Sequence, residues 1–130
     1  MDGIINVYKE RGYTSFDVVA KLRGILHERR IGHTGTLDPE AEGVLPVCVG
    51  QATKACELLL DKDKEYEAVI LFGLETDTQD ITGRILSSKV VTADAEEAQR
   101  ALLSFVGTYQ QIPPMYSALK VNGRKLYELA

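Results

Sequence analysis

Residues 32–50, GHTGTLDPEAEGVLPVCVG, constrain the fold more than any other part of the chain. Four glycines and two prolines fall within this stretch, which excludes a continuous helix through it. Glycine and the Asp-Pro pair are typical of turns, whereas the following run, VLPVCVG, predicts a buried strand. Pro46 has no backbone donor, so we expect it at an edge, a bulge or a strand start. The stretch therefore predicts a bend that carries Asp38 and leads into the core.

The first third of the chain predicts one strand and one helix. Residues 3–9, GIINVYK, are typical of a strand. Thr14 with Asp17 three places later predicts a capping box that opens a helix. The apolar face expected for that helix consists of Val18, Val19, Leu22, Ile25 and Leu26. Thr53 is expected to cap a short helix through residues 58–60.

The remainder predicts further strands and one more helix. Residues 64–75, KEYEAVILFGLE, give the clearest strand pattern, and the turn-rich DTQDITG followed by RILSSKVV predicts a hairpin. A second amphipathic helix, ended by Gly107, is predicted by Ala95, Ala98, Leu102 and Phe105. The dipeptide Asn122-Gly123 predicts another hairpin. This order favours an α+β fold with a mixed, mainly antiparallel sheet flanked by helices.

Length and composition narrow the class of protein. A chain of 130 residues suits one domain, and no apolar run reaches the roughly 18 residues of a membrane span. No signal peptide is recognisable. Cys48 and Cys56 have no partner histidines at ligand spacing, which argues for reduced thiols, no metal and a cytoplasmic location.

The charge distribution is uneven. Taken alone, the net charge of −4 disfavours a nucleic-acid partner. The excess of acidic residues, however, is concentrated in residues 55–112. A basic face could still form from Lys9, Arg11, Arg23, Arg29, Arg30, Lys120, Arg124 and Lys125. Ordinary solvated surface charge explains the same residues, so composition alone does not decide for RNA.

Asp38 itself allows several interpretations. Asp-Pro is a common turn initiator, and the surrounding glycines could simply supply backbone angles. A phosphate-cradling loop is a second possibility, but the spacing matches neither G-x-x-x-x-G-K-[ST] nor G-x-G-x-x-G. Local chemistry alone therefore leaves the role of Asp38 open.

Four segments taken together carry a resemblance. They are KERGYTS at 9–15, GHTGTLDPEAEGVLPVCVGQATK at 32–54, KEYEAVILFGLETDTQDITG at 64–83 and PPMYSALKVNGRKLYELA at 113–130. In this order they closely resemble the TruB family of tRNA pseudouridine synthases. The resemblance implies a cofactor-free isomerase that flips uridine-55 out of the T loop of tRNA and converts it to pseudouridine.

The resemblance also implies roles for individual residues. Asp38 matches the essential aspartate, which would attack C1′ or remove a sugar proton. His33 matches a histidine that fills the space left by the flipped base, and Tyr66 matches a tyrosine that stacks on the uracil. Lys54 matches a lysine that contacts phosphate. Lys9, grouped with the substrate-binding residues, is expected together with the YTS turn at 13–15 to brace the catalytic loop from beneath. A polar loop histidine, a core tyrosine and solvated lysines are the structural alternatives.

The chain departs from the family pattern in two ways. Lys9 is followed by Glu10 where the family usually has proline, so the turn is expected to be less rigid. The family chain also continues past LYELA with an arginine, then with strands that supply a second arginine facing the aspartate, and then with a PUA domain. We therefore interpret residues 1–130 as the N-terminal part of a catalytic domain, monomeric and inactive alone, with the tRNA T arm as partner and no protein or membrane partner. A binding-only tRNA chaperone and a small-anion or phosphotransfer protein are the rivals.

Overall fold

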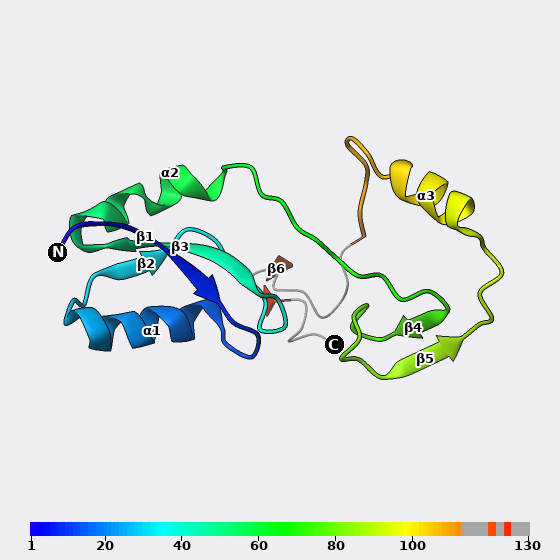
Figure 1. The fold of residues 1–130 in the computed structure, drawn as a ribbon, viewed down its shortest axis with the longest axis horizontal. Helices are drawn as coiled ribbons and strands as arrows, with labels where there is room; N and C mark the ends of the chain where they lie inside the picture. The colour runs from blue at the N-terminus through cyan, green and yellow to red at the C-terminus, as the bar shows by residue number, and fades with distance from the viewer. Residues whose placement is uncertain (113–119, 122–123, 126–130) are drawn as a thin grey trace. The chain divides into compact units, whose positions relative to one another are not determined.

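The computed structural model describes residues 1–112, 120–121 and 124–125 of the chain. It divides into two compact units, Met1–Tyr66 and Glu67–Ala130, each described by itself below. Helices and short sheets alternate along the chain, and every strand pair is antiparallel (Figure 1). The α+β class predicted from the sequence is confirmed.

The first unit contains a three-stranded antiparallel sheet. Its strands are β1 (Gly3–Lys9), β2 (Ile31–His33) and β3 (Gly43–Val49), in the order β1-β3-β2. β1 pairs along its whole length with β3, whereas β2 pairs only with the last three residues of β3. The predicted strand at 3–9 is confirmed, and β2 is a strand that the sequence did not reveal. The bend at 34–42 connects β2 to β3.

Pro46 lies inside β3, the central strand of the sheet, whereas the sequence predicted it at an edge, a bulge or a strand start. Its Cα partner on β1 is Asn6, and its carbonyl accepts from the Thr34 amide at 3.1 Å on the β2 side. The N–H and C=O of one strand residue point the same way, so the missing donor also faces β2. Because β2 has already ended at His33, no ladder hydrogen bond is lost there.

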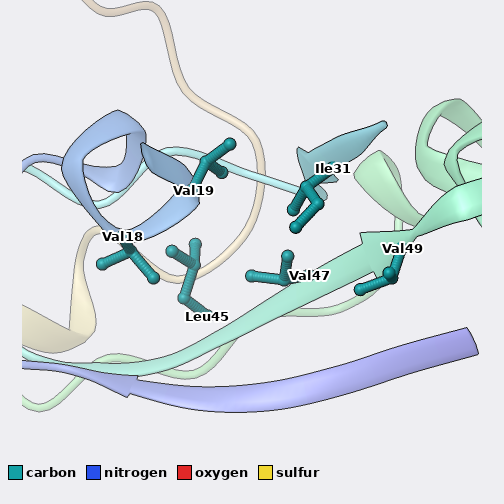
Figure 2. Packing of buried hydrophobic residues seen from close by; sticks show 6 residues of the cluster. All are labelled: Val18, Val19, Ile31, Leu45, Val47 and Val49. Carbon is teal, nitrogen blue, oxygen red and sulfur yellow. The ribbon is translucent and has the colours of Figure 1, made fainter. Parts of the chain in front are cut away.

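Helix α1 (Ser15–Leu26) supplies the other half of the core. Thr14 and Asp17 form the predicted capping box at its start. Figure 2 shows Val18 and Val19 of this helix facing Ile31, Leu45, Val47 and Val49 of the sheet. Alternate residues of β3 face one side of the sheet, which is why its odd-numbered residues form this core. Ile25 departs from the predicted apolar face, since 70% of it is exposed.

A 3₁₀ helix, η1 (Gly50–Ala55), and helix α2 (Cys56–Leu60) follow β3. Thr53 does not cap α2 as predicted; it lies within η1 and donates to the Gly50 carbonyl at 2.7 Å. Cys56 lies over the face of the sheet opposite α1, because a Cβ at Gly32 would be 3.3 Å from its sulfur. Gly32 is the cross-strand partner of Cys48, so both thiols occupy the same side.

The second unit holds a hairpin and a helix. Strands β4 (Leu74–Thr76) and β5 (Ile85–Ser88) pair antiparallel and confirm the predicted hairpin. The long strand predicted at 64–75 is wrong over most of its length, because only 74–76 is paired. An alternating pattern provides the side chains of a strand, but a strand also needs a neighbour to accept its backbone hydrogen bonds.

Helix α3 (Ala95–Leu103) begins with a capping box formed by Asp94 and Glu97 and ends four residues before Gly107. The short strands β6 (Lys120–Val121) and β7 (Arg124–Lys125) pair antiparallel on either side of the predicted turn. Residues 122–123 of that turn lie outside the described residues. Among residues 67–112 none is buried, so the core described above belongs to the first unit. No helix in the described part of the chain combines the length and apolar character needed to cross a membrane.

Candidate active site

The bend at residues 34–42, called the Asp38 loop below, presents Asp38 to solvent. Asp38 is exposed, and its carbonyl accepts from the Ala41 amide at 3.0 Å, which closes a turn after it. The loop leaves the sheet at Thr34, which is buried. Thr34 donates to the Pro46 carbonyl through its amide at 3.1 Å and its hydroxyl at 3.3 Å. The carboxyl group therefore projects from a loop whose first residue is fixed to β3.

Ser15 fixes the loop immediately before Asp38. The Ser15 hydroxyl accepts from the Leu37 amide at 2.9 Å and lies 3.3 Å from the Leu37 carbonyl, to which it donates. Only 2% of Ser15 is exposed, so water does not compete readily for these bonds. Ser15 is the first residue of α1, and the core packing of that helix is therefore transmitted to the backbone beside Asp38.

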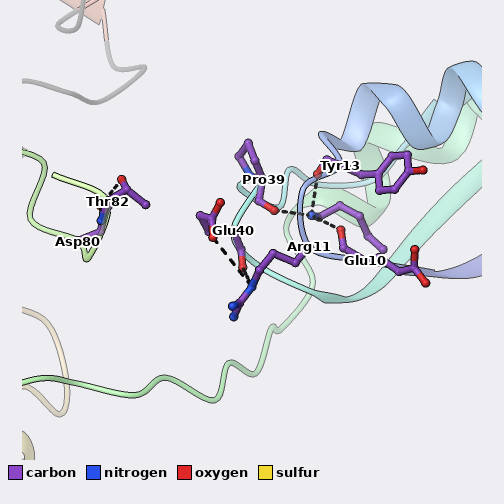
Figure 3. A network of polar contacts seen from close by, with 8 residues as sticks. Glu10, Arg11, Tyr13, Pro39, Glu40, Asp80 and Thr82 are labelled. Carbon is purple, nitrogen blue, oxygen red and sulfur yellow. Dashed lines mark hydrogen bonds and ion pairs between the residues drawn. The ribbon is translucent and has the colours of Figure 1, made fainter.

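Lys9 fixes the loop immediately after Asp38. Its side chain is fully buried, and its ammonium donates to the carbonyls of Tyr13 at 2.7 Å, Glu10 at 3.2 Å and Pro39 at 3.4 Å. Figure 3 shows Tyr13, Glu10 and Pro39 gathered around this contact. The Gly12 amide also donates to the Pro39 carbonyl, at 2.8 Å.

Lys9 has no exposed surface, so it lies beneath the Asp38 loop, in the bracing position expected of it, and not where it could contact RNA directly. The same contacts stabilise the turn after Lys9, which lacks the proline expected from the family. Gly12 adopts a φ of +86°, which side chains disfavour, and the buried ammonium holds the turn from inside.

Arg11 reaches the loop from the solvent side. Its Nε donates to the Glu40 carbonyl at 3.2 Å and lies 4.0 Å from the Glu40 carboxylate. Both side chains are more than half exposed, so the ion pair contributes little stability. The contact places a guanidinium two residues from Asp38 without bonding it to Asp38.

A hollow of about 360 Å³ adjoins the Asp38 loop. Its walls come from the loop, the start of β3, α2 and the segment that follows α2. The lining residues are Thr34–Leu37, Glu42–Pro46, Leu59 and Lys62–Tyr66. Leu37 and Leu59 are combined there with the charges of lysines and acids, which is typical of a site for a ligand that is part apolar and part polar.

The other predicted site residues occupy different places. Tyr66 lines the hollow, and 64% of it is exposed. His33 is half-buried at the end of β2, and its Nδ1 is buried without a hydrogen-bond partner among the described residues. Lys54 is exposed on η1. The hollow thus brings Tyr66 together with the backbone flanking Asp38, while Asp38, His33 and Lys54 are not among its lining residues.

The described residues were also compared with the requirements of a metal site. Among residues 1–112 and the four described residues beyond them, no group of three His, Cys, Asp or Glu side chains is placed to hold a metal ion.

Comparison with known proteins now identifies the family. The family described as TruB family pseudouridylate synthase (N terminal domain) matches residues 23–130.

The chain belongs to the TruB family.

Individual TruB relatives match along the whole chain. The tRNA pseudouridine synthase B of Lachnoclostridium phytofermentans is 67% identical over 130 residues, which are 100% of this chain and 42% of that protein. The proteins of the same name from Alkaliphilus oremlandii and Listeria innocua are 55% and 56% identical, and the match covers 44% and 43% of their lengths. The chain spans less than half the length of these curated relatives.

One solved structure also matches this TruB chain in part. A chain of an H/ACA RNP bound to a substrate RNA containing 2′-deoxyuridine is 46% identical to it. The match covers 43% of this chain and 18% of that one, with a TM-score of 0.42.

Two contacts of the site were not predicted from the sequence. The YTS turn is expected to brace the catalytic loop, but no local signal connects Ser15 to Leu37, which is 22 residues away. Lys64 is the first residue of the strand predicted at 64–75, whereas in the structure it contacts the end of α2 and lines the hollow. The Ser15 contact depends on how distant segments fold together, and the Lys64 contact depends on where α2 ends.

Proposed function

We propose that the full-length protein is a tRNA pseudouridine synthase that converts uridine-55 in the T loop to pseudouridine. The observation that carries the proposal is the exposed carboxyl group of Asp38. Leu37 before it is bonded to Ser15, and Pro39 after it is bonded to Lys9. The names of the relatives support the same reaction class. A fixed backbone around a solvent-facing carboxyl group is what a reaction at a bound nucleoside requires.

The reaction must break the bond between uracil and ribose, rotate the base and join C5 to C1′. A carboxyl group near the sugar can serve in two ways: it attacks C1′, or it removes a sugar proton. Both routes need the carboxyl oxygen within reach of the ribose, and neither needs a metal or an organic cofactor. Asp38 is the group we assign to this step.

The target base must first leave its stack in the T loop. We assign Tyr66 to stack on the flipped uracil, since it is exposed on the wall of the hollow beside the Asp38 loop. Stacking on an aromatic side chain contributes about 1–3 kcal/mol per base. His33, at the end of β2, is assigned to the space that the base leaves, and Lys54 to a phosphate.

The proposal also covers the partner, the oligomeric state and the location of the protein. The T arm of tRNA is the partner, the protein acts as a monomer, and the location is cytoplasmic. Residues 1–130 alone are expected to bind tRNA weakly and to be inactive, because the resemblance puts the arginine that faces Asp38 beyond them.

Tritium release tests the proposed reaction and its target. The C5 hydrogen must leave when C5 bonds to the sugar, so full-length protein incubated with tRNA that carries 5-tritiated uridine should release one tritium per tRNA. A T-arm stem-loop with cytidine in place of uridine-55 should release none. Equal release from both RNAs would contradict the assigned target, and no release from either would contradict the reaction.

A further inference from the structure

Lys64 follows α2 and binds the end of that helix. Its ammonium donates to the carbonyl of Leu60, the last residue of α2, at 2.6 Å and to the carbonyl of Lys62 at 2.9 Å. Carbonyls at a helix C-terminus lack partners within the helix, and a cation there is also favoured by the helix dipole. Lys64 therefore caps α2 from beyond its end.

The stem of the same side chain lies beside the Asp38 loop. Cε of Lys64 is near Gly35, since a Cβ added to that glycine would lie 3.8 Å from it. Gly35 is next to Thr34, which is bonded to Pro46, and two residues before Leu37, which is bonded to Ser15. The stem thus lies beside a part of the loop that is held in place from both sides.

Tyr66 comes two residues after Lys64. Neither Glu65 nor Tyr66 makes a hydrogen bond to another residue that the structure describes, and residues 63–71 have no regular secondary structure. Lys64 is therefore the nearest anchor for Tyr66, and both side chains line the hollow.

We infer that Lys64 is a positioning residue that sets Tyr66 against the Asp38 loop, a role that nothing in the comparisons assigns. The inference rests on the proposed function in so far as Tyr66 stacks on the flipped base. Loss of the Lys64 cap would let the segment leading to Tyr66 move away from Gly35. The base would then be held less well, while contacts between the protein and the rest of the tRNA would persist.

The first test does not depend on activity. Hydrogen–deuterium exchange is measured by mass spectrometry on the full-length protein and on the variants Lys64→Met, Lys64→Arg and Lys62→Met. Lys62 lines the same hollow, so Lys62→Met removes the same charge and keeps the cap. We expect faster exchange across residues 61–66 in Lys64→Met only. Unchanged exchange in Lys64→Met, or equal acceleration in Lys62→Met, overturns the inference.

The second test couples Lys64 to Tyr66. Single-turnover tritium release should fall about tenfold in Lys64→Met, because misplacement by about 1 Å has effects of that order or larger. The dissociation constant for tRNA should change little, and Lys64→Arg, which can still donate to both carbonyls, should recover most of the rate. In a protein that already carries Tyr66→Leu, adding Lys64→Met should lower the rate of tritium release almost no further.

The outcomes separate the inference from the proposed function. If the wild-type protein releases no tritium, the proposed function fails and the exchange experiment alone decides the anchoring role. If Lys64→Met slows release equally with and without Tyr66, Lys64 acts by general stability, and the positioning role is overturned. If Lys64→Met and Lys62→Met weaken tRNA binding to the same extent, Lys64 acts by charge, and the positioning role is likewise overturned.

Discussion

The hydroxyl of Ser15 holds both backbone groups of Leu37, accepting from the amide at 2.9 Å and donating to the carbonyl at 3.3 Å. Leu37 immediately precedes Asp38, and Pro39 immediately follows it in contact with the ammonium of Lys9. The Asp38 loop is thus fixed on both sides of its exposed carboxyl group by residues from the first strand and the first helix. This relationship yields two predictions.

Ser15→Ala should reduce both the stability of the protein and its activity. We expect a loss of about 1–2 kcal/mol in the free energy of unfolding, because the Leu37 amide loses its partner. The rate constant kcat should fall about tenfold, since Asp38 is no longer held in register with the substrate. Asp17→Asn, which weakens the start of the same helix without touching Leu37, is the control. Equal kcat values for the two variants would show that Ser15 acts only through the helix.

Lys9→Met should lower stability and activity together. Methionine fills a similar volume but donates nothing, so the carbonyls of Tyr13, Glu10 and Pro39 lose a buried donor. We expect a loss of about 2–3 kcal/mol in the free energy of unfolding, measured from the urea midpoint at constant slope. A variant as stable as the wild type would contradict the account of the buried ammonium.

The start of α1 should be sensitive to acid. Hydrogen bonds from the Thr14 hydroxyl and from its backbone amide lower the pKa of Asp17 below the ordinary value of 3.8. A carboxyl group with a lower pKa in the folded state binds fewer protons there than when unfolded. Its contribution to stability is complete above the unfolded pKa and is lost as the pH falls through the folded one.

An NMR titration of the Asp17 carboxyl group measures this directly. Its pKa should lie below 3.8 in the wild type and rise in Thr14→Ala, which loses the hydroxyl donor and keeps the backbone amide. Stability should decline as the pH falls below about 4 in the wild type, and this component should be missing from Asp17→Asn. The same pKa for Asp17 in wild type and Thr14→Ala would contradict the capping box.

The two thiols should react at different rates. Burial, followed by the hydrogen bond and the charge of Cys56, raises the pKa of Cys48 to about 11. At pH 8 only about one in a thousand Cys48 side chains would be thiolate, the form that reacts with alkylating agents. Mass spectrometry after iodoacetamide treatment should find Cys56 modified first and Cys48 protected until urea unfolds the protein. Early modification of Cys48 would contradict its burial.

Local sequence patterns predicted the local features of this protein well. The capping box of Thr14 and Asp17 needs only residues three apart, and it formed as predicted. The hairpin of β4 and β5 is also a contact between neighbouring segments. In both cases the residues that decide the structure lie within one short window.

Features that depend on distant partners were not predictable in the same way. The strand expected at 64–75 lacks a paired neighbour over most of its length, and Pro46 is accepted inside β3 only because β2 stops at His33. The sequence indicated Asp38 through its turn and through the family resemblance. It could not show that Ser15, 22 residues before Leu37, holds the loop.

Comparison of the full-length protein with its Asp38→Asn variant tests the central claim most directly, with tritium release and tRNA binding measured on the same samples. The amide has nearly the same shape as the carboxyl group but cannot act as a nucleophile or base. We predict that release falls to the background level while the dissociation constant for tRNA stays within about threefold of the wild type, under 1 kcal/mol. Release at the wild-type rate by Asp38→Asn would contradict the account and favour a protein that only binds tRNA.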